Sequence, residues 1–220
     1  MPNLPPGLRI VALSLLLVTL SAHGCVTPEP RAFRHPGFNP LEIRRPALVL
    51  QLSLGQTGFP GEGEFSPRKE NSFPSAFEIA LLEGFNTEGI LPVDVTLSTR
   101  RSPGGTPFEG IDRRQALDRG RALHADIVVI LDATFSRRDL VFCREERRPF
   151  ITRATLWMLG VEVLRVGDGT PLLVEPPGPA LQLSDIEPDC ERGRIERRRS
   201  TQELLHLAVQ KVLALLLRRK

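Results

Sequence analysis

Short apolar runs that alternate with helical patterns predict a domain of interleaved strands and helices after residue 45. Each expected strand is an aliphatic stretch bounded by proline, glycine or charged residues. The expected strands are residues 47–54, 90–97, 126–135, 151–166 and 171–174. The run DIVVILDATF at 126–135 is the most apolar of them, which favours a central place in the sheet. Pro92 indicates an edge position or a late start for the second strand.

Three helices are expected among these strands, each opened by a capping box in which Ser or Asp precedes Glu or Gln by three residues. The pairs are Ser75 with Glu78, Asp112 with Gln115, and Ser200 with Glu203. The last helix is apolar around much of its girth, which favours burial in the core or against a partner subunit. GDGT at 167–170 predicts a hairpin turn. The order β-α-β-α-β, hairpin, α predicts an α/β sandwich, a single domain with a mixed sheet and helices packed on it.

The N-terminus has the parts of a secretory signal. Arg9 supplies a positive charge, and residues 10–20 (IVALSLLLVTL) form an apolar run. This run is shorter than the ~20 residues that span a bilayer. Gly24-Cys25 resembles the end of a lipobox, the motif cut by lipoprotein signal peptidase. We therefore predict that residues 1–24 are a lipoprotein signal peptide and that Cys25 is lipidated; the alternative is ordinary secretion with Cys25 as a free thiol.

Residues 25–45 are predicted to be the lipid attachment and a flexible tether, because they hold four prolines and no apolar period. The α/β domain would then cover residues 46–220. Acyl chains such as palmitate on Cys25 would hold the protein on a membrane by burying methylene groups. By analogy with enterobacterial lipoprotein sorting, Val26 after the cysteine favours the outer membrane, with the domain facing the periplasm; exposure at the cell surface is left open.

The two remaining cysteines, Cys143 and Cys190, are predicted to form a disulfide, because an even pair in an oxidising compartment is usually bonded. Cys143 precedes the first strand of the predicted hairpin and Cys190 follows the second. This placement would put both at the open end of one hairpin. Two separate buried thiols fit less well, because both neighbourhoods are strongly charged. No histidine is near either cysteine, so a metal site is not expected.

Charge is close to balanced, at +3 from 29 basic and 26 acidic residues. A nucleic-acid partner is not expected, because such binders concentrate a larger basic excess on one face. Arginines cluster beside both cysteines and could bind anionic lipid, a cell-wall polymer or an acidic envelope protein. The alternative is a solvated surface of mixed charge, because glutamates are interleaved. The candidate patch consists of Arg144, Arg147, Arg148, Arg194, Arg197 and Arg198.

Catalytic chemistry has little support in the sequence. The four histidines show no metal-ligand spacing, and no serine stands in a G-x-S-x-G motif. The glycine-rich residues 55–63 lack the Lys-Ser/Thr of a phosphate-binding loop. Asp126 and Asp132 flank the central strand and are the candidates for an acid–base pair, whereas His124 is expected at a helix end. We expect no catalytic residues, no metal and no cofactor.

Two segments resemble one family. RALHADIVVILDATF (121–135) resembles the helix, Ala-Asp and strand of the CsgG-like and penicillin-binding-protein-activator lipoproteins, and VEVLRVGDGTPLLVE (161–175) resembles their next hairpin. The resemblance implies a compact α/β domain on a lipid tether that acts through protein contacts. The implied role is a non-catalytic interaction or assembly component, with a homo-oligomer allowed. The alternatives are an oligomeric subunit of a secretion complex and an envelope hydrolase.

The pore-forming members of this family carry membrane-spanning hairpins with alternating apolar and polar residues. The corresponding segments here, 136–149 and 176–199, are predicted to be loops and are charged or rich in proline. Such residues are costly against lipid, so a pore is not expected.

Overall fold

The computed structural model describes residues 32–54, 60–61, 64–65, 72–101, 112–146 and 148–217. All of them belong to one compact unit that begins at Arg31. The predicted signal peptide, Cys25, most of the glycine-rich segment 55–63 and Arg147 lie outside the described residues. Their predicted roles stay predictions.

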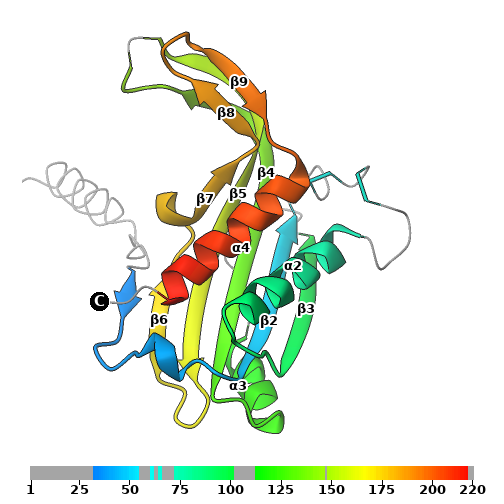
Figure 1. Ribbon diagram of the computed structural model, residues 1–220, viewed down its shortest axis with the longest axis vertical. Coiled ribbons are helices and arrows are strands. Elements are labelled where there is room, and N and C mark those ends of the chain that lie inside the picture. Colours follow the sequence, from blue (N-terminus) through cyan, green and yellow to red (C-terminus); the bar gives the residue numbers. More distant parts are fainter. Residues whose placement is uncertain are drawn as a thin grey trace, which may run out of the picture. The chain divides into compact units, whose positions relative to one another are not determined.

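A mixed sheet of seven strands forms the body of the domain (Figure 1). The strands are β1 (Phe33–Arg34), β2 (Pro46–Leu54), β3 (Asp94–Arg101), β4 (Ile127–Phe142), β5 (Phe150–Arg165), β6 (Pro171–Glu175) and β7 (Gln182–Ser184). Their order is β1-β6-β5-β4-β2-β3, with β7 also paired to β5. β2 runs parallel to β3 and β4, and the other pairs are antiparallel. The predicted α/β fold with a mixed sheet is confirmed, and the apolar run lies centrally, in β4.

Three helices pack on this sheet: α2 (Phe73–Thr87), α3 (Arg113–Ala122) and α4 (Thr201–Leu217). α2 and α4 lie side by side on one face (Figure 1), and α3 covers part of the other. Two short 3-10 turns, η1 (Pro40–Glu42) and η3 (Pro179–Leu181), join the elements. No described helix has both the length and the apolar content to span a bilayer.

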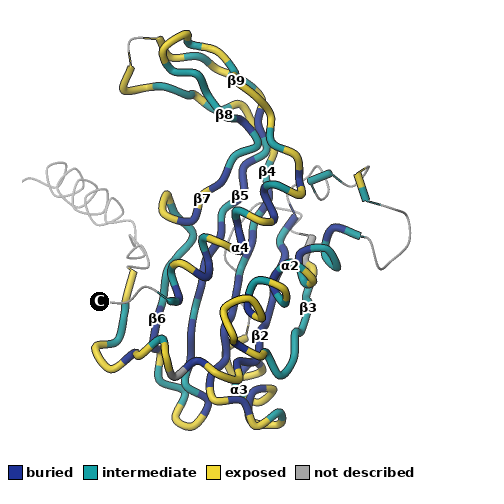
Figure 2. Tube along the Cα trace, viewed as in Figure 1, coloured by how far each residue is buried: buried dark blue, intermediate teal, exposed yellow. Residues whose placement is uncertain are grey.

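The main core fills the space between the sheet and helices α2 and α4, seen as buried segments in Figure 2. At its centre Trp157 of β5 is fully buried. Its ring meets that of Phe135 at 5.0 Å and that of Phe73 at 5.5 Å, both edge to face. A Cβ at Gly84 of α2 would collide with Val209 of α4. A glycine is therefore required where these two helices cross.

A smaller core lies between α3 and the opposite face of the sheet. Gly120 of α3 faces β4, and a Cβ there would lie 2.6 Å from Cγ2 of Val128. The helix ends in a Schellman arrangement: His124 N–H donates to the Arg121 carbonyl and Ala125 N–H to that of Gly120. His124 has a φ of +52° and occupies the left-handed position that ends the helix. Its predicted place at a helix end is confirmed.

The N-termini of α3 and α4 lie where the capping boxes predicted them, whereas that of α2 differs. Asp112 caps α3 through the Arg114 N–H, and the box of α4 is complete, since Ser200 N–H donates to Glu203 at 2.7 Å and Glu203 N–H to the Ser200 hydroxyl at 3.2 Å. In α2 the N-cap position is Ser72 rather than Ser75, and its side chain makes no capping hydrogen bond. The helix begins earlier in the chain than predicted, because proline is favoured in the first turn of a helix, where Pro74 lies.

Part of the predicted tether belongs to the fold. β1 pairs with β6, and Phe38 and Ile43 are buried in the main core. The guanidinium of Arg34 lies 4.8 Å from the centre of the Phe38 ring. The domain therefore starts near residue 33 rather than at 46. The sequence did not predict this because the apolar residues are too few and too widely spaced among prolines to show a period.

Two segments predicted as loops form strands instead. β4 and β5 continue past the sheet as a two-stranded ribbon, residues 137–142 paired with 150–155. Within 176–199, β8 (Ile186–Asp189) and β9 (Arg194–Arg198) form a separate hairpin. The ribbon and this hairpin, residues 136–155 and 185–199, together project from one end of the sheet (Figure 1). We call them the arm.

Candidate functional site

The arm has one covered side and one bare side. Along the ribbon, side chains alternate between its two sides. Phe142 and Phe150 are half-buried and stack at 5.6 Å, and Ala154 on the same side is fully buried. The opposite side, which we call the bare face, is exposed. Its members are Arg137, Asp139, Val141, Ile151 and Arg153.

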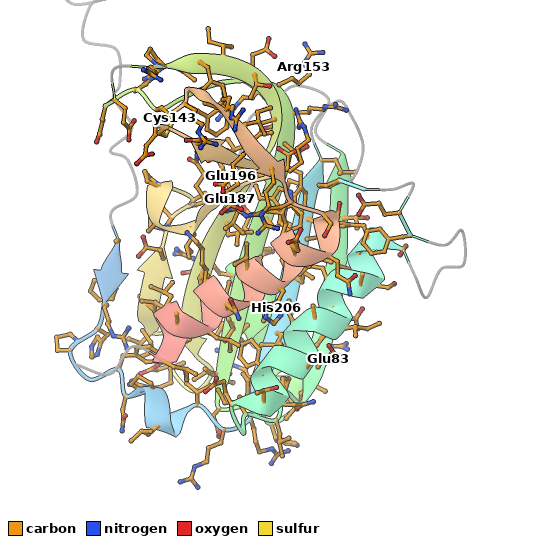
Figure 3. The ribbon with its side chains drawn as sticks, turned by 45° about the horizontal axis from the view of Figure 1, so that its top comes forward. Glu83, Cys143, Arg153, Glu187, Glu196 and His206 are labelled. Carbon is orange, nitrogen blue, oxygen red and sulfur yellow. A yellow bond between two sulfur atoms is a disulfide. The ribbon has the colours of Figure 1, made fainter. Side chains whose placement is uncertain are left out.

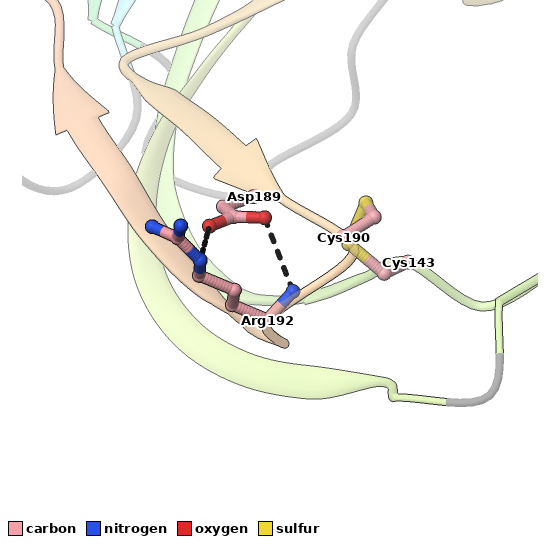
Figure 4. The surroundings of a disulfide bond; sticks show 4 residues. All are labelled: Cys143, Asp189, Cys190 and Arg192. Atoms are coloured by element: carbon pink, nitrogen blue, oxygen red, sulfur yellow. Dashed lines mark hydrogen bonds and ion pairs between the residues drawn. A yellow bond between two sulfur atoms is a disulfide. The ribbon is translucent and has the colours of Figure 1, made fainter.

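The cysteines join the tips of two hairpins (Figure 4). Cys143 lies in the turn from β4 to β5 and Cys190 in the turn from β8 to β9, with 5.4 Å between their Cα atoms. This distance is usual for a disulfide, and the predicted pairing is confirmed. Its predicted position is wrong, because the second hairpin was not predicted. The tips are also closely packed, since a Cβ at Gly193 would lie 3.0 Å from Cβ of Arg148.

Most described arginines of the candidate patch bind groups of the arm itself. Arg198 pairs with Asp185 at 3.2 Å, Arg194 with Asp189 at 3.7 Å, and Arg148 donates to the Glu191 carbonyl. Arg144 forms no ion pair within the described residues. These pairs match the mixed-charge alternative more closely than a row of unpaired arginines. Figure 3 shows charged side chains of both signs on the arm, among them Arg153, Glu187 and Glu196.

Arg197 ties the arm to the body. Its guanidinium lies between Glu187 of β8, at 2.6 Å, and Glu203 of α4, at 2.7 Å. These two carboxylates raise the pKa of Arg197, with Glu203 contributing most. The Ser200 N–H and then the Arg197 guanidinium lower the pKa of Glu203 below its usual value of 4.5. The pair is exposed and adds little stability by itself, but it fixes the direction in which β9 enters α4.

A second set of contacts stiffens the base of the arm. Asp185 accepts a hydrogen bond from the Thr155 N–H at 2.7 Å, and its own N–H donates to the Thr155 carbonyl. Arg199 donates to the carbonyls of Ser184 and Ile186. The chain therefore leaves the sheet through a hydrogen-bonded corner.

The two aspartates considered for acid–base chemistry do not form a pair. Asp126 stands just before β4, and Asp132 lies six residues further along it. Six residues of strand span about 20 Å. Asp126 borders a hollow of about 440 Å³ at the end of the sheet opposite the arm. Among the described residues that line this hollow, neither His124 nor Asp132 is present.

The bare face was missed from the sequence. Val141 and Ile151 are directly opposite one another across the ribbon and are 38% and 70% exposed. Arg153 and Asp139 beside them form an ion pair at 3.3 Å. The available clue was the alternation in FITR and DLVF, which is typical of strands but is obscured by the neighbouring arginines.

No protein-family model matches the chain, and no curated protein matches it in sequence. Solved structures with a similar arrangement include the PelC dodecamer from Paraburkholderia phytofirmans, 14% identical over 86% of this chain and 97% of that chain, TM-score 0.40. Lipoprotein GNA1162 from Neisseria meningitidis is 12% identical over 79% of this chain and 100% of that chain, TM-score 0.33.

A third structure, the putative neuraminyllactose-binding hemagglutinin homolog from Helicobacter pylori, is 10% identical over 86% of this chain and 87% of that chain, TM-score 0.35. Likeness at these levels carries no conclusion about family, partner or activity. The CsgG-like resemblance therefore stays a hypothesis.

Proposed function

We propose that the mature chain is a lipid-anchored component of the bacterial envelope that works by binding another envelope component, without catalysis. The observation that carries this proposal is the disulfide of the arm in a chain whose N-terminus reads as a lipoprotein signal. Disulfides persist in oxidising compartments outside the cytoplasm. The bond and the signal thus support the same location, and Val26 favours the outer membrane within it.

The bare face of the arm is the proposed binding surface. Val141 and Ile151 give it an apolar centre, and the Asp139–Arg153 pair gives it a polar rim. This arrangement is typical of protein interfaces. The arm contains eleven arginines and eight acidic residues, a formal charge of +3. An excess of this sign would speed encounter with an acidic protein or polymer.

Cys25→Ala is expected to abolish membrane attachment, because acyl chains can then no longer be added. The measurements are mass spectrometry of the mature N-terminus and the share of protein that sediments with membranes. The wild type should carry acyl groups on Cys25. A wild-type protein recovered from the cytosol with residues 1–24 intact would contradict the proposal.

The same cells can test the binding surface. Ile151→Asp is expected to abolish in vivo crosslinking of the protein to its envelope partner, because a charge would be placed in the apolar centre. The matched control is Ile79→Asp on α2, where Ile79 is 47% exposed and far along the chain from the arm. Equal crosslinking by both variants would argue against the bare face as the binding surface.

The alternatives predict other outcomes. An oligomeric subunit of a secretion complex would show a multiple of the monomer mass in light scattering after extraction in detergent. An envelope hydrolase would retain its activity in the Ile151→Asp variant, which leaves the body of the domain unchanged.

A further inference from the structure

Two adjoining hollows are lined by residues near the amino ends of β2, β3 and β4. These strand ends lie at the end of the domain opposite the arm (Figure 1). The hollows have volumes of about 440 and 720 Å³, and they share Leu41, Ile43 and Arg44. Leu41 and Leu91 line the larger hollow and are each 65% exposed. A single exposed leucine is ordinary, but two on one hollow form an apolar patch. We call Leu41, Arg44, Arg45, Leu91 and Leu217 the basal face.

The basal face is also basic. Arg44 and Arg45 are exposed, and neither forms an ion pair within the described part of the chain. Their backbones are fixed, since the Arg44 carbonyl accepts from the Leu91 N–H and the Arg45 carbonyl from that of Asp126. The acidic residues that line the hollows are Glu88 and Asp126.

The proposed lipid anchor is close to this end of the domain along the chain. Only seven residues, 26–32, separate Cys25 from β1. Eight residue steps reach at most about 29 Å when fully extended. η1, with Leu41 on it, begins six residues after β1. An acylated Cys25 would therefore hold the domain within a short distance of the bilayer.

We propose that the basal face rests on the anionic surface of the membrane that holds Cys25. The leucines would enter the headgroup boundary, and Arg44 and Arg45 would meet lipid phosphates. Such attraction fades beyond about 8 Å at physiological salt, and the short link lets the basal face come within that distance of the bilayer. This inference rests on the proposed anchor. It orients the arm away from the membrane, toward the partner.

The test uses the mature acylated protein, reconstituted into vesicles of phosphatidylethanolamine and phosphatidylglycerol with brominated acyl chains. Leu91→Trp adds a reporter to the basal face, and Ile151→Trp adds a matched reporter to the arm. Trp157 is fully buried and serves as a constant background. We expect the bromine atoms to quench the added emission of Leu91→Trp and to leave that of Ile151→Trp unchanged. Adding Arg44→Glu and Arg45→Glu to Leu91→Trp should restore the emission.

The outcomes separate this inference from the anchor. If the protein floats with the vesicles but Leu91→Trp keeps its emission, the anchor stands and the basal contact is wrong. If the protein does not float, the anchor itself fails. A Leu91→Trp spectrum already shifted to shorter wavelength in detergent, together with a dimer mass in light scattering, would show that a second copy covers the face and would also overturn the inference.

Discussion

Replacing Trp157 by alanine should lower the free energy of unfolding by about 3–5 kcal/mol, the usual cost of deleting a buried aromatic side chain. Trp157 is fully buried and touches rings from two other elements, Phe73 and Phe77 of α2 and Phe135 of β4. The change would leave a cavity where α2 meets the sheet. It therefore loosens the packing that joins the helix layer to the strands.

Chemical denaturation followed by far-ultraviolet circular dichroism measures this loss without the indole signal. Ile151→Ala on the bare face is the control and should stay within about 0.5 kcal/mol of the wild type. Trp157→Phe should cost less than Trp157→Ala. The indole N–H has no acceptor within the described residues, so its removal breaks no hydrogen bond. A loss below about 1 kcal/mol for Trp157→Ala would show that the aromatic cluster is not the centre of stability.

Loss of the disulfide, by Cys143→Ser with Cys190→Ser, should cost about 2–4 kcal/mol. The bond closes a separation of 47 residues and so restricts the unfolded chain strongly. Much of the loss of stability should be confined to the arm, because its ribbon is packed on one side only. The body keeps its own core and should remain folded.

Hydrogen exchange measured residue by residue distinguishes local from global loss. In the double variant, amides of 140–142, 150–152 and 186–198 should exchange much faster, while those of β2 and the buried part of β4 change little. Cys25→Ser is the matched control, since it removes a cysteine outside the arm. Unchanged exchange in the arm after loss of the bond would mean that the ion pairs and strand pairing suffice to hold it.

The body of the domain was predictable because burial imposes a regular pattern there. β4 was recognisable as a central strand because Ile127 to Leu131 are all buried, with apolar residues facing both layers. The start of α4 was predictable because its capping box uses neighbouring residues. Both signals are local in sequence. The general fold class followed from them.

The arm was not predictable because its order depends on contacts between distant segments. Arg198 meets Asp185 across 13 residues, and Arg153 contributes its carbonyl to Arg198 across 45. Because the ribbon is exposed, its strands can carry charged residues and still pair well. The charged sequence of residues 136–149 therefore resembles that of a loop. The cysteine pair itself was predictable, since only two cysteines remain after Cys25. Its place in the fold required the β8–β9 hairpin.

Because β4 runs without a break from the sheet into the arm, the arm is a stiff extension of the sheet rather than a segment joined to it by a hinge. The strand keeps its pairing with β5 from Ile127 to Phe142 without a break, a length of about 50 Å. Tension on the disulfide-closed tip would be carried along this one strand into the middle of the sheet. A partner that pulls on the tip would thereby place the whole domain under tension.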